Sequence, residues 1–297
     1  LFGSVAIAGG IAFGFYKLKQ VPENPLKSTP ERHVLNPFVF IDRNGITLIA
    51  PKAEMGQGVH TTWAALIAEE LDVELDQINV IHGPPAIAYY NSALMGAALP
   101  FLDYKIGRFQ DDLRGFVGES GKLLGIQLTG GSTSMKDGFE RMRKVGASAR
   151  ETLKQAAANE WGLKRSDLST SAGIVAAASG QSGRYEDFAE AASKISPVHG
   201  VLRSPNEWRL IGKSQPRVDM VAKVTGTAEF GADVRLPNIK FATVRMNPKR
   251  SGMISFDSSK AETMAGVEKI VDIGGGIAVI ASNTWLAMQA ADAVEII

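Results

Sequence analysis

The sequence predicts a mixed α/β fold of the α+β kind, arranged in two parts. Short apolar runs that alternate with turn residues indicate strands near the start of the chain. Apolar residues recur at three- and four-residue steps over 135–161, which predicts one long helix. After about residue 210, short strand patterns alternate with short helix patterns, which predicts a smaller α+β unit.

Composition and charge narrow the classes of function. The chain has 297 residues, and its 32 Lys and Arg residues balance 31 Asp and Glu residues. A net charge of +1 gives no electrostatic field that would gather nucleic acid. The sequence contains no Cys, which excludes disulfides and every iron–sulfur cluster that is held by Cys.

Residues 1–16 form an uncharged apolar run that is followed by Lys17 and Lys19. A spanning helix needs about 20 residues, so this run matches the apolar region of a signal peptide or part of a membrane anchor. A buried helix is the alternative. We therefore expect a signal or anchor over 1–20 and a proline-containing linker over 21–36.

The first part of the chain is predicted to begin with a hairpin, a helix and a strand. Asn44-Gly45 stands between two apolar runs and predicts a hairpin over 38–50. A helix is expected over 59–71 and a strand over 78–81. The segment 86–128 has weak periodicity and is predicted to hold short helices or a functional cover.

The elements that follow are predicted from their periodicity and their end signals. Gly162 is a good stop for the long helix. Further on we expect a strand pair over 167–178, a helix over 185–195 and a linker over 197–205. In the second part, strands are expected over 239–246, 254–257, 267–273 and 277–281, helices over 258–264 and 283–294, and a last strand from Glu295.

Two glycine turns carry the residues that suggest chemistry. Gly56 and Gly58 flank Gln57 between a predicted strand and a predicted helix, so backbone there can approach a ligand closely. The helix start offers free N–H groups that suit an anion or an oxo group. A dinucleotide turn is disfavoured because Thr61 stands where a third glycine is needed, and a purely structural turn is the simpler alternative.

The second glycine turn, 129–134, opens the long helix with small and hydroxyl residues. It presents N–H groups for a phosphate, unless Ser132 or Ser134 merely caps the helix. The four histidines lack metal-ligand spacing and are interpreted as structural residues or hydrogen-bond partners. The pair Glu69-Glu70 is interpreted as a helix face and not as an acid/base pair.

Three ordered segments resemble one family. The string AEMGQGVHT at 53–61 resembles the molybdenum-cofactor loop of the xanthine dehydrogenase and aldehyde oxidase family. The string TGGSTS at 129–134 resembles a later cofactor loop of its isoquinoline oxidoreductase branch. The strings PRVD at 216–219, KVTGTA at 223–228 and DVRLP at 233–237 look like the opening of its hammerhead domain.

This resemblance implies a domain plan and a cofactor. It implies the first part of a molybdenum-cofactor-binding domain over 37–200 and an incomplete α/β hammerhead domain over 210–297. The chain would be the N-terminal part of a large subunit of the isoquinoline 1-oxidoreductase or membrane-bound aldehyde dehydrogenase type. The implied cofactor is molybdopterin cytosine dinucleotide.

The resemblance also implies the roles of individual residues. Gln57 would be the catalytic-site residue that hydrogen-bonds the molybdenum oxo ligand. The other implied cofactor contacts come from the two turns and are Gly56, Gln57, Gly58, Val59, His60, Gly130, Gly131, Ser132 and Thr133. The family's catalytic glutamate lies in a part of the subunit that these 297 residues do not include.

The activity implied is oxidation of aldehydes to carboxylic acids with water as the oxygen source. An N-heterocycle hydroxylase of the isoquinoline type, a non-catalytic redox scaffold and a nicotinamide-dependent dehydrogenase are the alternatives. Electrons would pass to a [2Fe-2S] small subunit, then to a cytochrome c subunit that carries haem c, and to quinone. The expected location is the periplasmic side of the bacterial inner membrane, which the N-terminal segment would contact.

Overall fold

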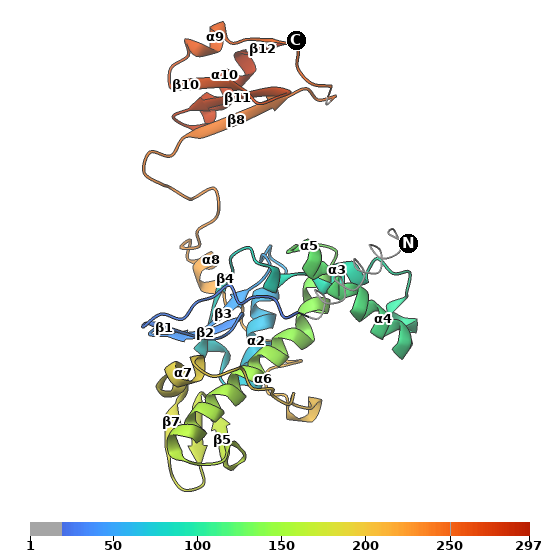
Figure 1. Ribbon diagram of the computed structural model, residues 1–297. Helices are drawn as coiled ribbons and strands as arrows, with labels where there is room; N and C mark the ends of the chain where they lie inside the picture. The colour runs from blue at the N-terminus through green and yellow to red at the C-terminus, as the bar shows by residue number, and fades with distance from the viewer. Residues whose placement is uncertain (1–19, 250) are drawn as a thin grey trace, which may run out of the picture. The chain divides into compact units, whose positions relative to one another are not determined.

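The computed structural model describes residues 20–249 and 251–297. The chain divides into two compact units, of which the first ends at Gly226 and the second begins at Thr227. Both units combine helices with small sheets (Figure 1), so the predicted mixed α/β class is confirmed at that level. The expected signal or anchor at 1–16 lies outside the described residues. Within the described residues, no helix has the length and apolar character needed to cross a bilayer.

The main sheet of the first unit has the strand order β1-β2-β3-β4. Its strands are β1 (Arg32–Asn36), β2 (Val39–Asp42), β3 (Gly45–Ala50) and β4 (Ile78–His82). The first three strands pair antiparallel, and the predicted hairpin turns at Gly45 with φ 99°. Strands β3 and β4 are parallel and are joined through helix α2 (Val59–Leu71). This βαβ connection positions the first glycine turn at the carboxyl end of β3.

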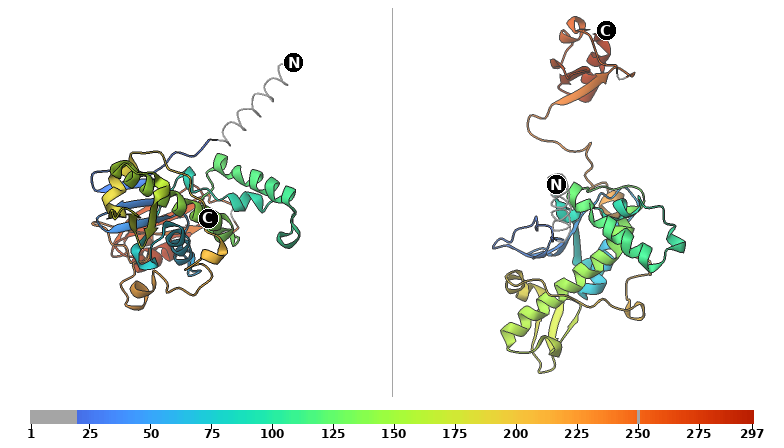
Figure 2. Two further views of the ribbon diagram at one scale, coloured as in Figure 1. Left: turned by 90° about the horizontal axis from the view of Figure 1, so that it is seen from below. Right: turned by 45° about the vertical axis from the view of Figure 1, so that its right-hand side comes forward.

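Helix α2 packs against α6 (Thr133–Trp161), the longest helix of the described chain, and the two run side by side in both views (Figures 1 and 2). Glycines of α6 permit this approach. A Cβ added to Gly146 would lie 2.7 Å from the carbonyl oxygen of Ile67 on α2. The core of the unit forms where the main sheet, α2, α6 and α7 (Tyr185–Ser193) meet. Gly162 ends α6 with φ 67°, as predicted.

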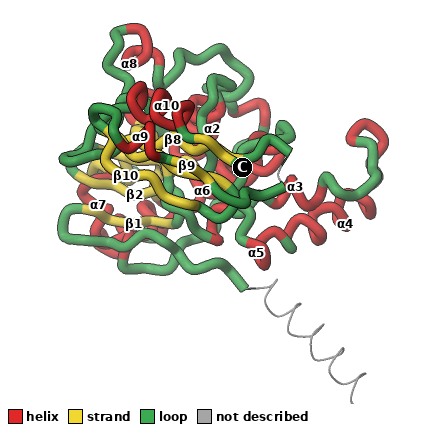
Figure 3. Tube along the Cα trace, turned by 90° about the horizontal axis from the view of Figure 1, so that it is seen from above, coloured by secondary structure: helices red, strands yellow, loops and turns green. Residues whose placement is uncertain are grey.

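The segment 86–128 holds three short helices, which confirms the prediction for this region. They are α3 (Ser92–Gly96), α4 (Arg108–Glu119) and α5 (Gly121–Leu124), and Figure 3 shows α3 and α4 projecting to one side. A second, antiparallel sheet has the order β5-β6-β7. Its strands are β5 (Leu168–Ser171), β6 (Ile174–Ala177) and β7 (Ser182–Arg184). A short helix, α8 (Met220–Val224), lies close to the end of the first unit.

The second unit contains a three-stranded antiparallel sheet in the order β10-β11-β8 and a two-stranded sheet, β12-β9. Its strands are β8 (Phe241–Met246), β9 (Phe256–Asp257), β10 (Val267–Asp272), β11 (Gly276–Ala281) and β12 (Glu295–Ile296). Its helices are α9 (Ser259–Glu262) and α10 (Thr284–Ala293). All seven elements predicted for this region are present. A small core forms between β11 and α10.

The division between the units lies later than the linker that the sequence predicts at 197–205. Residues 203–219 instead lie along α2, where Glu69 and Glu70 hold them. The Glu69 carboxylate accepts the backbone N–H groups of Arg209 and Leu210 at 2.7 and 2.6 Å. Both glutamates have 0% exposure, so the interpretation of this pair as a helix face was wrong. The sequence could not predict these partners, which lie more than 130 residues away.

Candidate functional site

The first glycine turn follows β3 and precedes α2, and its backbone is exposed. Gly56 has φ 101° and Gly58 has φ 82°, values that favour glycine over every residue with a side chain. A Cβ at either position would find nothing within 4 Å. Open space therefore borders the backbone here, as a close approach by a ligand requires.

The side chain of Glu54 holds this turn in shape. Its carboxylate accepts the N–H groups of Gly56 at 2.8 Å, Gly58 at 2.9 Å and His60 at 3.2 Å. Burial acts to raise the pKa of Glu54, but these N–H donors outweigh it and the pKa lies below its ordinary value. Of the N–H groups expected to be free at the start of α2, Glu54 therefore accepts those of Gly58 and His60, whereas those of Val59 and Thr61 make no hydrogen bond with the described residues.

Gln57 lies exposed at the tip of the turn, with its amide oriented by its own loop. Its Oε1 accepts the N–H of Met55, and its Nε2 donates to the carbonyl of Ala53 at 2.9 Å. A primary amide has two N–H donors, and the second makes no hydrogen bond with the described residues. The turn thus presents a fixed neutral donor.

The two residues after the turn have buried side chains. Val59 is 2% exposed and His60 is 8% exposed. The Nε2 atom of His60 lies 3.0 Å from the carbonyl oxygen of Lys52, and its ring meets the His82 ring edge-on at a centroid distance of 4.8 Å. Burial lowers the pKa of His60, and the hydrogen bond to Lys52 opposes this effect. Cofactor contact by these two residues stays a prediction.

The second glycine turn leads into α6 and leaves backbone donors available. Gly131 has φ 60°, and Ser132, the N-cap, has φ 54°. The left-handed conformation is costly for a residue other than glycine. Ser132 occupies the N-cap position, as the simpler alternative has it, but its side chain makes no capping hydrogen bond. No backbone hydrogen bond of the described residues uses the N–H of Gly131 or Ser132.

Direct contacts fix the two turns relative to each other. The N–H of Ala53 donates to Thr129 Oγ1 at 2.8 Å. One residue earlier, the ammonium of Lys52 pairs with Asp137 on the first turns of α6, and both side chains are almost fully buried. Burial lowers the pKa of Lys52, against the opposing effect of Asp137.

Asp137 is a functional candidate that sequence reasoning missed. Besides Lys52, its carboxylate accepts the N–H of Ser92 at 3.0 Å and its hydroxyl at 2.6 Å, and Arg141 lies 3.1 Å away. Asn91 adds a hydrogen bond of 2.7 Å to Thr133 Oγ1. In sequence, Asp137 is one polar residue within an amphipathic helix pattern, and nothing marks it as the centre of a network.

A cleft of about 790 Å³ lies at the carboxyl ends of β3 and β4, and it meets the two turns at Met55 and Thr129. Ligands of open α/β sheets bind at this end of the strands. The cleft is lined by Ala50, Pro51, Lys52, Ala53, Met55, His82, Gly83, Pro85, Ala86, Ile87, Gly125, Gln127, Leu128 and Thr129. None of the predicted contact residues at 56–60 and 130–133 lines the cleft itself, and we take the cleft together with the two adjoining turns as the candidate site.

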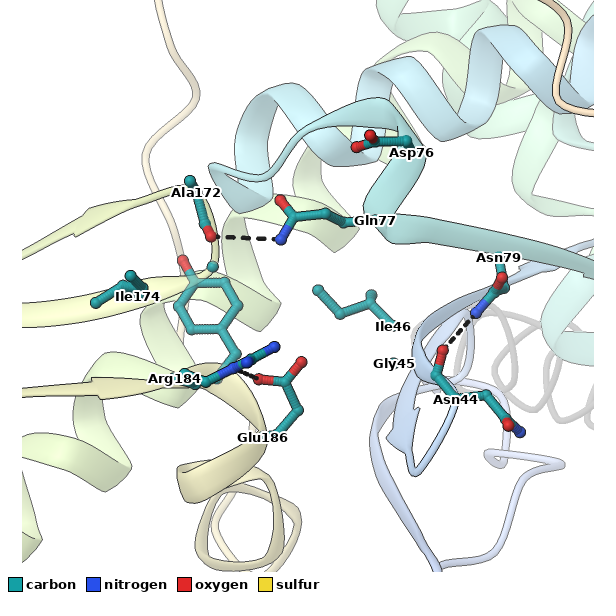
Figure 4. Close-up of a pocket in the computed structure, with 12 residues that line it drawn as sticks. Asn44, Gly45, Ile46, Asp76, Gln77, Asn79, Ala172, Ile174, Arg184 and Glu186 are labelled. Carbon is teal, nitrogen blue, oxygen red and sulfur yellow. Dashed lines mark hydrogen bonds and ion pairs between the residues drawn. The ribbon is translucent and has the colours of Figure 1, made fainter.

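A second cavity, of about 320 Å³, lies at the opposite, amino end of the same two strands (Figure 4). Several of its polar groups pair across the cavity walls: Asn79 donates to the carbonyl of Asn44, Gln77 to that of Ala172, and Arg184 to Glu186. We assign no function to it. Over the described residues, no group of three His, Cys, Asp or Glu side chains is arranged to hold a metal ion.

Several known proteins are similar in sequence to this chain. No family model matches the chain. The isoquinoline 1-oxidoreductase subunit beta of Brevundimonas diminuta is 26% identical over 98% of this chain and 37% of its own length. The membrane-bound aldehyde dehydrogenase [pyrroloquinoline-quinone] of Gluconacetobacter polyoxogenes is 24% identical over 98% of this chain and 36% of its own.

A shorter match covers 22% of this chain, at 37% identity, with 16% of the nicotinate dehydrogenase large molybdopterin subunit of Eubacterium barkeri. The chain is a distant homologue of molybdopterin large subunits. It spans about a third of the length of the two relatives that it matches nearly from end to end. Molybdopterin is the cofactor that this homology implies, and the subunit names imply a complex of several chains.

Proposed function

We propose that the chain is part of the molybdopterin-binding large subunit of a molybdenum hydroxylase. One observation carries the proposal: the two exposed glycine turns are joined by the hydrogen bond from Ala53 to Thr129, and residues at their starts, Met55 and Thr129, line one cleft at the carboxyl ends of parallel strands. This arrangement supports a bulky cofactor that is approached by backbone from two sides. We propose its cytosine dinucleotide form.

The two turns take different roles in this proposal. Gly56 and Gly58 bring backbone to the cofactor, and the free amide hydrogen of Gln57 donates to one of its acceptor atoms. The N–H groups of Gly131 and Ser132 face the negative charge of a phosphate, at the positive end of α6. Gly130 and Thr133 line the same turn. Val59 has a buried side chain and would contact the cofactor through its backbone, whereas the backbone N–H of His60 already donates to Glu54.

When bound, a molybdenum cofactor supplies a two-electron oxidation in which the added oxygen comes from water. Aldehydes are the proposed substrate class. N-heterocyclic aromatics are the second candidate, because isoquinoline and nicotinate name two of the relatives. Electrons would leave through a [2Fe-2S] subunit and a cytochrome c subunit to quinone, on the periplasmic side of the inner membrane.

Metal analysis and a matched pair of variants test the proposal. The purified full-length protein with its partner subunits should contain molybdenum, whereas a non-catalytic scaffold would not. In Gln57→Ala, a hydrogen-bond donor to the cofactor is lost, and turnover should fall by roughly 10²–10³-fold by analogy with oxyanion holes. Aldehyde and N-heterocycle substrates are assayed in parallel to decide the substrate class.

Gln77→Ala is the control. Both amide atoms of Gln77 are also hydrogen-bonded: Oε1 accepts the N–H of Glu74 in its own loop, and Nε2 donates to the carbonyl of Ala172 in the turn between β5 and β6. Gln77 lies at the opposite end of the strands. This variant should keep wild-type turnover. Wild-type turnover of Gln57→Ala at full molybdenum occupancy would show that Gln57 does not contact the cofactor.

A further inference from the structure

The segment 203–219, which we name the α2 strap, is hydrogen-bonded to α2 near both ends of that helix. At the C-terminal end of α2, Glu70 Oε2 accepts the N–H of Arg203 at 3.0 Å, beside the Glu69 contacts described above. At the N-terminal end, the N–H of Val218 donates to Thr61 Oγ1 at 3.1 Å. The strap therefore brings the string PRVD at 216–219 beside the first glycine turn.

Arg217 connects the strap to that turn. Its Nη1 donates to the carbonyl oxygen of Gly56 at 2.9 Å, and its Nη2 lies 3.3 Å from Glu54 Oε1. On its other side the guanidinium is held by the carboxylate of Asp219, at 2.9 and 3.0 Å. Lys223 in turn binds Asp219. One planar guanidinium thus joins the backbone of the turn to the carboxylate that shapes it.

We propose that Arg217, oriented by Asp219, is a positioning residue that holds the Gly56–Gln57–Gly58 turn in its cofactor-binding conformation. The inference rests on the proposed function for the identity of the ligand, but the contacts are independent of it. A turn with two glycines at positive φ has many alternative conformations in the absence of restraint. Arg217 restrains it at Gly56 directly and at Gly58 and His60 through Glu54.

The chemistry of the side chain explains why arginine is suited to this position. A guanidinium presents donors in a rigid fork that reaches several acceptors at once, whereas a lysine ammonium is a point charge on a flexible stem. Glu54 has a side chain only 7% exposed, so loss of Arg217 would leave a shielded carboxylate without its cationic partner. The turn would then exchange between conformations.

Amide hydrogen exchange in the full-length protein with its partner subunits tests the proposal, together with molybdenum content. Arg217→Gln should raise the exchange rate of a peptide covering 53–62 by about tenfold or more, as expected for loss of charge-assisted hydrogen bonds. Molybdenum content should fall several-fold in the same preparation. Arg217→Lys should restore only part of either property, and Asp219→Asn should show a weaker version of the Arg217→Gln effect.

The matched control is Arg209→Gln. Arg209 is in the same strap but binds Glu74 and the carbonyl of Val73, at the far end of α2. It should leave exchange over 53–62 and molybdenum content unchanged. In the double variant Glu54→Gln/Arg217→Gln, the rise in exchange should be smaller than the sum of the two single effects, because the two side chains share one contact.

The exchange rate and the molybdenum content together distinguish a failure of the positioning role of Arg217 from a failure of the proposed function. Unchanged exchange over 53–62 in Arg217→Gln would overturn the positioning role, whatever the molybdenum content. Raised exchange with full molybdenum content would also overturn it, since the turn would bind cofactor without this restraint. Absence of molybdenum from the wild-type complex would instead contradict the proposed function, and the exchange data alone would then decide whether Arg217 holds the turn.

Discussion

Gly58 combines a backbone conformation that favours glycine with open space through which a ligand can approach. At φ 82°, a β-branched residue is strained by about 1–3 kcal/mol, and its side chain would also project into open space beside the turn. Gly58→Val should therefore lower both the melting temperature and the molybdenum content of the purified complex. Metal analysis and a thermal scan measure the two effects.

Gly45→Val is the control that separates the effect of backbone strain from the effect of blocked cofactor access. Gly45 has a similar φ of 99° and equally open surroundings, but it lies in the hairpin at the amino end of β3. We expect a comparable loss of melting temperature with normal molybdenum content per folded protein. Equal loss of molybdenum in both variants would mean that the Gly58 effect is only a folding defect.

His60 gives the unit a predictable pH dependence. Burial lowers its pKa, with a smaller contribution from His82 in the same direction. The folded state therefore binds fewer protons than the unfolded state, and stability is present above the ordinary His pKa of about 6.5 and is lost as pH falls below it. The urea midpoint should decrease from pH 7.5 to 5.5, and His60→Asn should flatten this slope. An equal slope in both proteins would contradict the assignment.

Single residues also mark the limit of sequence reasoning about the site. Gly56, Gln57 and the second turn could be selected because their spacing and chemistry are local. Glu54 was missed because a carboxylate next to a glycine turn has no distinctive pattern. Arg217 was missed because its partners lie more than 160 residues earlier, and only the folded strap brings them together.

At the scale of elements, most boundaries follow from short-range signals. Periodicity gave helix α2 at Val59–Leu71, and the Asn44-Gly45 turn gave the hairpin of β2 and β3. The pairing of β3 with β4, and of α2 with α6, depends on contacts between distant segments, which a single sequence does not encode locally. The buried Glu69-Glu70 pair was misinterpreted for the same reason.

The contact between α2 and α6 gives a prediction that compares two helical glycines. Gly146 faces Ile67, and an added Cβ would lie 2.7 Å from a backbone oxygen, so Gly146→Ala should destabilise the fold by about 1–3 kcal/mol. Gly115 on exposed α4 has nothing within 4 Å, so Gly115→Ala should stabilise it by about 0.5–1 kcal/mol. Urea unfolding measures both. Stabilisation by Gly146→Ala would contradict the close packing of the two helices.

At the scale of the molecule, the described chain consists of units with unequal cores. The first unit buries a large continuous cluster from its main sheet and three helices. The second buries nine apolar residues among those described, and they are Ala261, Ile277, Ala278, Val279, Ala281, Ala287, Ala290, Ala291 and Val294. A small core supplies little net stability once the entropy of the chain is offset. Arg245 adds support by donating to the carbonyls of Ala291 and Val294 at 2.9 Å.

Among the described residues, trypsin should cleave first in the connection between the two units. Nearly all residues from 225 to 238 are exposed and lie outside helices and strands. Arg235 lies within this stretch, and its guanidinium contacts only the carbonyls of Ala232 and Val234. Proteolysis requires an extended, accessible backbone, so cleavage after Arg235 should precede cleavage at the paired arginines of the α2 strap.

The two fragments should then differ in stability. The larger one keeps the strap, the two turns and the main core, and should melt close to the temperature of the first unit in the intact chain. The smaller one, 236–297, should melt earlier because nine buried apolar residues and one hydrogen-bonded arginine are its main restraints. Calorimetry of the separated fragments measures this difference. Early cleavage at Arg203 or Arg209 would contradict the position of the boundary, since those bonds are protected only if the strap belongs to the first unit.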